Sequence, residues 1–215
     1  MKNLETPKTK LALFGVQGSV GNALLVESLG RQFETSVILS DLNAVTARPG
    51  IRAKQGDLFD PIGVSRSVAG MDGVICILSN PHLAAGADDR QLRSFDDQFV
   101  AIGALLDGLV IAGVRRLLLV GDFSWLDYDE QLPSPTLDLL EQRLLDSSLA
   151  WTLVDAPAVA EQLLEFDDFA HPHEGSETSE LEPLRRFAAG VLDEFELANH
   201  IHERIRLTDH REVSP

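Results

Sequence analysis

Short, mostly apolar segments alternate with helical patterns along most of the chain. The apolar segments lie at residues 10–14, 36–39, 51–55, 73–78, 116–120 and 151–154. Helices are predicted between these segments, from apolar residues at helical spacing or from helix start and stop signals. They lie at residues 20–31, 61–68, 95–112, 135–146 and 184–197. Short apolar strands without polar alternation are typical of a parallel sheet that is buried on both faces. The pattern therefore predicts an α/β fold, with a doubly wound parallel sheet and helices on both faces.

The length and the polar breaks predict how this fold is arranged. The 215 residues suffice for one large domain and are too few for two comfortable ones, so we expect a single domain over residues 1–215. Its core spans about residues 9–157. Residues 165–182 are rich in Asp, Glu, His and Ser and predict a mobile surface loop. The helix at 184–197 is expected on the sheet edge, or in a homodimer contact, and the alternating residues 201–207 predict an edge strand.

Charge and cysteine content restrict the partners and the compartment. The formal net charge is −16, and such a surface repels phosphate backbones and anionic lipid, so we expect no nucleic-acid or membrane partner. Cys76 is the one cysteine and lies in an apolar segment, which predicts a buried, inert thiol and a reducing compartment. The first ten residues are polar and lack the apolar run of a signal peptide. We therefore expect a cytoplasmic protein.

A glycine-rich turn follows the first apolar segment. Gly15, Gly18 and Gly21 lie between this expected strand and the expected helix, in the spacing G-x-x-G-x-x-G. In a dinucleotide site the first glycine permits the turn, the second lets the backbone approach the pyrophosphate, and the third lets helix and strand pack closely. Asp41 follows the second strand, where an acidic side chain accepts the adenosine ribose hydroxyls. The alternative is a structural turn without a ligand.

Several motifs together resemble a known superfamily. They are residues 14–21, Gln55-Gly56-Asp57-Leu58-Phe59-Asp60-Pro61, residues 68–75, residues 112–121 and Asp193-Glu194-Phe195-Glu196. Together they resemble the atypical short-chain dehydrogenase/reductases, and among these the NAD(P)H-binding, NmrA-like group that includes NADH-flavin reductases. The resemblance covers Lys10 to about Pro157 and, more faintly, residues 184–207. It implies a Rossmann-type fold and a nicotinamide cofactor.

The resemblance also implies which residues hold that cofactor. Those implied for the phosphates are Gly15, Gln17, Gly18, Ser19, Val20 and Gly21, those for the adenine are Asp57 and Leu58, and those for the nicotinamide side are Leu78, Ser79, Asn80 and Gly121. Many members of the group carry Arg where Ser40 stands, and this Arg pairs with a 2′-phosphate. The pair Ser40-Asp41 lacks that cation, which favours NAD over NADP, although Arg48 could replace it.

The catalytic pair of classical short-chain dehydrogenases is absent from the sequence. That pair is a Tyr with a Lys four residues later, in which the Lys lowers the pKa of the Tyr. The one tyrosine is Tyr128, Leu132 stands four residues later, and all lysines lie at or before Lys54. Ser124 remains as a candidate hydrogen-bonding group near the nicotinamide, or as an ordinary loop serine. Phe123, Trp125 and Phe166 are either flat walls for a ring or core residues.

Two functions from different classes fit these residues. The first is an NAD(P)H-dependent oxidoreductase that passes hydride to a flavin or another planar acceptor, because a flavin supplies its own electron sink. The second is a non-catalytic, dinucleotide-sensing regulator of the NmrA-like kind. A third alternative is an isomerase or epimerase that keeps its cofactor, but the absence of the catalytic Tyr argues against it. The pairs His171/His173 and His200/His202 lack a fixed third ligand, so we expect no metal site.

Overall fold

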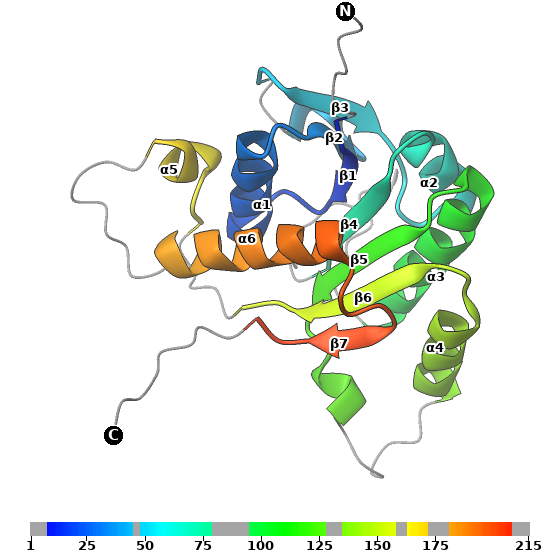
Figure 1. Cartoon of the computed structure of the whole chain (residues 1–215). Helices are drawn as coiled ribbons and strands as arrows, with labels where there is room; N and C mark the ends of the chain where they lie inside the picture. Colours follow the sequence, from blue (N-terminus) through cyan, green and yellow to red (C-terminus); the bar gives the residue numbers. More distant parts are fainter. Residues whose placement is uncertain are drawn as a thin grey trace, which may run out of the picture.

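Seven parallel strands form one sheet. The computed structural model describes residues 8–44, 48–78, 95–127, 135–157, 163–171 and 181–207. Its strands are β1 (Lys10–Phe14), β2 (Glu34–Leu39), β3 (Ile51–Gln55), β4 (Gly73–Ile77), β5 (Arg116–Gly121), β6 (Ala150–Asp155) and β7 (Glu203–Ile205). They lie in the order β3-β2-β1-β4-β5-β6-β7, and every neighbouring pair is parallel (Figure 1). The chain winds outward in both directions from the middle of the sheet, which confirms the predicted doubly wound Rossmann-type fold.

Helices cover both faces of this sheet. They are α1 (Ser19–Gly30), α2 (Pro61–Val68), α3 (Phe95–Ala112), α4 (Pro135–Asp146), α5 (Phe166–Ala170) and α6 (Leu181–Leu197), with short 3₁₀ turns η1 (Leu42–Ala44) and η2 (Ser124–Asp127). One face carries α2, α3 and α4, and the other carries α1, α5 and α6 (Figure 1). Among the described residues, no helix combines the length and the apolar character needed to cross a bilayer.

Successive residues of each central strand enter opposite cores. In β1, Ala12 and Phe14 pack under α2 and α3, whereas Leu11 and Leu13 pack under α1 and α6. This division follows from the alternation of side chains along a strand, and it explains why the central strands are apolar throughout. Cys76 in β4 is fully buried, which confirms the predicted burial of its thiol, and this burial raises the pKa of the thiol.

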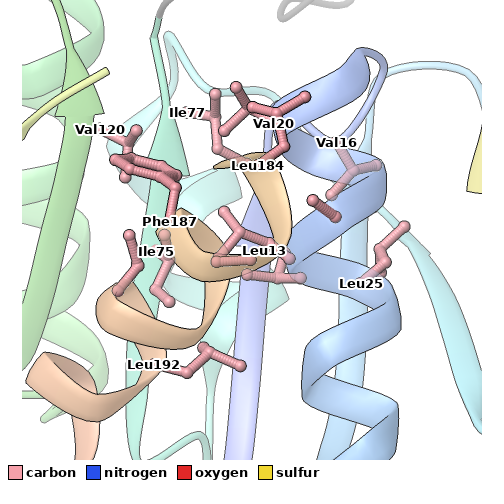
Figure 2. Close-up of a cluster of buried hydrophobic side chains, with 14 of the residues drawn as sticks. Leu13, Val16, Val20, Leu25, Ile75, Ile77, Val120, Leu184, Phe187 and Leu192 are labelled. Carbon is pink, nitrogen blue, oxygen red and sulfur yellow. The ribbon is translucent and has the colours of Figure 1, made fainter. Parts of the chain in front are cut away.

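The helix expected on the sheet edge lies instead on a sheet face. It begins at Leu181, three residues earlier than predicted, and packs beside α1. Figure 2 shows Leu184, Phe187 and Leu192 of α6 among side chains of the central strands and α1. The predicted apolar stripe is confirmed, but a stripe alone does not determine the apolar surface against which it packs. Because this stripe is buried within the chain, it is not available for the dimer contact that was the alternative.

The acidic stretch 165–182 is not a continuous loop. Residues 166–170 form α5, residues 181 and 182 belong to α6, and residues 172–180 lie outside the described part of the chain. The N–H of Glu165 donates to the carboxylate of Asp168 at 2.8 Å, and Phe169 is fully buried. The buried ring of Phe169 and this cap stabilise a short helix, which the polar composition of the stretch does not predict.

Candidate dinucleotide site

Two glycines of the turn after β1 are required by close packing. Gly15 has φ +79°, and a Cβ on it would lie 2.2 Å from the carbonyl oxygen of Ile77 in β4. A Cβ on Gly21 would lie 2.4 Å from the Cα of Val16. Any side chain at either position would therefore push backbone segments apart. The first and third glycines let strand, turn and helix meet at the middle of the sheet.

Gly18 stands under a different constraint. Its φ of 174° and ψ of 170° are extended values that any residue adopts, so the backbone conformation does not call for glycine. It is the N-cap residue of α1, and the first helical hydrogen bond runs from the N–H of Asn22 to its carbonyl at 2.8 Å. No side chain in the described part of the chain caps the helix, and its first turn carries no acidic residue.

The start of α1 therefore has the features of an anion site. The N–H groups of Ser19, Val20 and Gly21 precede the first helical hydrogen bond and have no partner within the helix. They lie at the positive end of the helix dipole. The side chains of Val16 and Val20 point into the core (Figure 2), so these two residues can offer a ligand only their backbone.

Ser19 and Asn22 bind a segment from far along the chain. Ser19 Oγ accepts the N–H of Leu164 at 2.9 Å, and Asn22 Nδ2 donates to the Leu164 carbonyl at 2.9 Å. Ser19 is almost completely buried, and Gln17 is half-buried. The sequence signalled Ser19 as a phosphate neighbour, but it gave no sign of the role of Asn22, whose partner lies 142 residues away.

Asp41 lies where the sequence places it, two residues beyond the end of β2. It is exposed, and its Oδ1 accepts both the backbone N–H and the side-chain amide of Asn43, each at 2.9 Å. Among the described residues, its Oδ2 has no hydrogen-bond partner. The carbonyl of the neighbouring Ser40 accepts from Gln55 Nε2 at 3.3 Å. One carboxylate oxygen thus remains for a ligand.

Arg48, the alternative cation for a 2′-phosphate, lies at the opposite end of the strands. Its carbonyl accepts the N–H of Ile51, and Ile51 pairs with Thr35 near the start of β2. About 13 Å of strand separate Thr35 from the end of β2, beyond which Asp41 lies. The Arg48 guanidinium forms a two-pronged ion pair with Asp167, with N···O distances of 2.7 and 3.2 Å.

The residues implied for the adenine and the nicotinamide differ in burial and in their hydrogen bonds. Asp57 Oδ1 accepts the N–H of Phe59 at 2.8 Å, while the Leu58 side chain is buried in the core below α2 and α3. The N–H of Leu78 donates to Val120 at 2.7 Å, and a Cβ on Gly121 would lie 3.3 Å from the Leu78 side chain. Ser79 and Asn80 lie outside the described residues.

Beyond β5, the candidate serine is held by a neighbouring carboxylate. Ser124 is exposed, and its N–H donates to Asp122 Oδ1 at 2.9 Å. Hydrogen bonds from the backbone and the hydroxyl of Ser124 lower the pKa of Asp122. Phe123 is buried in the core and is not a ligand wall, because the turn after β5 directs its ring inward. The side chain of Trp125, and all of Tyr128, lie outside the described residues.

Four charged residues form a cluster of ion pairs that connects β6, η2 and the β7 segment. Arg204 Nε donates to Asp155 Oδ1 and Arg204 Nη1 to Asp127 Oδ1, each at 2.8 Å, and Arg206 contacts the other oxygen of each carboxylate at 2.7 and 2.8 Å. Burial alone would lower the pKa of Arg204, and the hydrogen bonds with Asp155 and Asp127 outweigh it and raise that pKa. Sequence reasoning missed this cluster, although two arginines two residues apart in an expected strand share one face.

The two histidines after α6, His200 and His202, both lie outside the strands. His202 has φ +64°, and β7 begins only at Glu203. His200 Nδ1 lies 2.7 Å from Glu194 Oε2, and His202 Nε2 lies 2.8 Å from the Leu149 carbonyl. Each ring therefore has its own partner, which lies in α6 for His200 and in the segment before β6 for His202. Among the described residues, no group of three His, Cys, Asp or Glu side chains could hold a metal ion.

Comparisons with solved structures find the same fold. A Rossmann-fold NAD(P)-binding family protein from Shigella flexneri is 14% identical, with a TM-score of 0.63 and coverage of 93% of each chain. An anaerobillin reductase from Escherichia coli O157:H7 is 19% identical, with a TM-score of 0.58, 96% of this chain and 100% of that chain. A Bordetella bronchiseptica enzyme in complex with NAD⁺ is 11% identical, with a TM-score of 0.62, 94% of this chain and 76% of that chain.

Comparison with protein families gives the more specific result. No curated protein matches the sequence. The profile of the NAD(P)H-binding family matches residues 15–165, which is well over half of the chain and begins at the first glycine of the turn. On this match, the chain belongs to the NAD(P)H-binding family.

Proposed function

We propose that the protein is an NAD(P)H-dependent reductase that passes hydride to a flavin or another planar acceptor. The observation that carries the proposal is the start of α1, where three backbone N–H groups without helical partners follow a glycine that the backbone conformation does not require. A ligand phosphate at this corner explains that glycine, because any side chain there would intrude on the ligand. The amides of Ser19, Val20 and Gly21 would hold the pyrophosphate.

The surroundings of Asp41 and Arg48 support NAD over NADP. Asp41 Oδ2, which has no hydrogen-bond partner in the described part of the chain, fits a ribose hydroxyl and would repel a 2′-phosphate. Arg48 is the one Lys or Arg between residues 32 and 51, and it is bound to Asp167 near the other end of the strands. No cation from this stretch is therefore placed beside Asp41 to pair with an extra phosphate.

The chemistry requires little of the protein beyond orientation. A bound reduced nicotinamide supplies the hydride, and an acceptor ring that stores the electrons needs no tyrosine to protonate a carbonyl oxygen. The absence of the Tyr–Lys pair from the sequence therefore favours a planar acceptor over a simple ketone. The reductase among the structural neighbours supports the same class of reaction.

A binding and turnover experiment tests the proposal. The purified protein is titrated with NADH and NADPH, and NADH oxidation is followed with free flavins and a panel of quinones. We expect binding and acceptor-dependent oxidation, both abolished in Gly18→Asp, which adds bulk and negative charge at the phosphate corner. Gly30→Asp is the matched control, because a Cβ at Gly30, at the far end of α1, meets nothing within 4 Å.

The possible outcomes separate the two candidate functions. Absence of NADH and NADPH binding, or equal binding by Gly18→Asp and the wild type, would overturn the site. Tight binding without oxidation by any acceptor would overturn the reductase and favour the dinucleotide-sensing regulator.

A further inference from the structure

Residues 163–171, called the strap below, link the start of α1 to two other parts of the molecule. The strap contains α5 and lies beside α1 (Figure 1). Its first contact is Leu164, which is 4% exposed and bonded through both its N–H and its carbonyl to the first turns of α1. Its second contact is the Phe169 carbonyl, which accepts from Arg185 of α6.

The third contact is a charged clamp at the outer side of the strap. The Arg48 guanidinium pairs with both oxygens of Asp167 and stacks on the ring of Phe166, 4.2 Å from its centroid. The side chains of Arg48 and Asp167 are 30% and 63% exposed, so the clamp is partly open to solvent. The strap is therefore fixed at α1, at α6 and beside the start of β3.

The Leu164 contact leaves the Ser19 hydroxyl ready to donate. A hydroxyl has one hydrogen to donate and two lone pairs to accept. In the described part of the chain, the hydrogen bond from Leu164 N–H is the one interaction of Ser19 Oγ, so one lone pair is occupied and the hydrogen has no acceptor. An accepted hydrogen bond also strengthens the donation from the same oxygen. Ser19 is the first helical residue, and its own N–H is one of the three amides at the start of α1 that have no partner within the helix.

We propose that the strap is a positioning element for the dinucleotide: Leu164, fixed by Asn22, holds Ser19 so that its hydroxyl donates to the phosphates. This inference rests on the proposed function. It adds that dinucleotide binding depends on the strap, because Ser19 is oriented only while Leu164 is bonded to α1. Asn22 and Asp167 are then positioning residues, which act through Leu164 and need not touch the ligand. Loosening the strap at either place should speed release of the dinucleotide.

The dissociation rate of NADH tests this inference in three single variants. Asn22→Ala removes the bond to the Leu164 carbonyl and should raise the rate about two- to tenfold, the worth of one hydrogen bond. Asp167→Asn weakens the clamp and should raise it about two- to fivefold. Asp107→Asn is the matched control, because Arg143 Nη2 pairs with both oxygens of Asp107, at similar exposure, on the other face of the sheet. It should leave the rate unchanged.

A double-mutant cycle separates positioning from simple stabilisation. In the Ser19→Ala background the hydroxyl is gone, so adding Asn22→Ala should change the NADH dissociation rate little further. The thermal midpoint of the ligand-free protein is measured for every variant to confirm that it folds. Rates equal to wild type in both Asn22→Ala and Asp167→Asn, or fully additive effects in the cycle, would overturn the positioning role. Failure of the wild type to bind NADH would instead overturn the proposed function.

Discussion

Removing the charge of Glu194 should destabilise the protein without affecting the dinucleotide site. Glu194 and Arg116 are 5% and 8% exposed, and their side chains are 2.7 Å apart. Glu194 also accepts from Thr152 and from the backbone and ring of His200. Breaking a buried ion pair costs about 3–5 kcal/mol, because it leaves the other charge buried and unpaired.

Arg116 depends strongly on that carboxylate. Among the described residues, its Nε is the buried side-chain polar atom without a hydrogen-bond partner, so the guanidinium is already incompletely satisfied. Glutamine keeps the size and an acceptor, so Glu194→Gln should cost about 3 kcal/mol, near the lower end of that range. With a typical denaturant slope, the urea midpoint should fall by roughly 1 M. Glu182→Gln, which removes an exposed pair with Arg186, should cost under about 1 kcal/mol.

The same pair predicts how stability depends on pH. Burial raises the pKa of Glu194, but the hydrogen bonds from His200 and Arg116 outweigh burial and lower it below its ordinary value of 4.5. A carboxylate with a lowered pKa in the folded state stabilises the protein above its unfolded pKa, and this stabilisation is lost as the pH falls through the folded pKa. Glu194→Gln should therefore flatten the loss of stability below about pH 4.5. A loss under about 0.5 kcal/mol at pH 7, or an unchanged acid limb, would refute this account.

Three further predictions concern single positions. Asp41→Ala should weaken NADH binding more than NADPH binding, because it removes the ribose acceptor and the charge that repels a 2′-phosphate; equal losses in titrations would contradict the preference. Gly21→Ala should lower the free energy of unfolding by about 1–3 kcal/mol, because its methyl group would meet Val16 at 2.4 Å; an unchanged urea midpoint would contradict this packing. Cys76 should resist an aromatic disulfide reagent at pH 8 until the protein unfolds; fast labelling of the folded protein would contradict its burial.

Local signals in the sequence were sufficient for the sheet and the glycine turn. Apolar strands buried on both faces, and helices between them, identify a parallel sheet without knowledge of tertiary contacts. Gly15 is predicted to permit the turn and Gly21 to let helix and strand pack closely, and the structure shows a φ of +79° at Gly15 and a space at Gly21 that Val16 closes off. Both of these constraints arise within one strand–turn–helix unit. Such predictions succeed when the residues that determine a feature are neighbours in the sequence.

The features that were missed depend on contacts between distant segments. Helix α5 has five residues, too few to be stable alone, and it forms because Phe169 is buried and Arg185 binds its end. The partner of Asn22 is 142 residues away, and Asp127 and Arg206 are separated by 79 residues. A single sequence contains no local signal for such pairs, since polar residues in loops have many alternative partners.

The charges at the carboxyl edge of β5 and β6 lead to a prediction about the acceptor. In the described residues of this edge, Arg204 and Arg206 are both committed to Asp127 and Asp155, and Asp122 adds a further negative charge. An anionic acceptor therefore meets no unpaired cation here and approaches a protein of net charge −16. If the proposed reductase activity holds, kcat/KM at low salt should be higher for riboflavin than for its phosphorylated form.

Salt provides the control, because it screens repulsion between exposed charges and has little effect on a neutral ring. Raising the ionic strength should increase kcat/KM for the phosphorylated flavin and leave that for riboflavin nearly constant. A clear preference for the phosphorylated flavin at low salt, decreasing as salt is added, would show that a cation recognises the phosphate. The paired state of Arg204 and Arg206 would then be the wrong basis for acceptor choice.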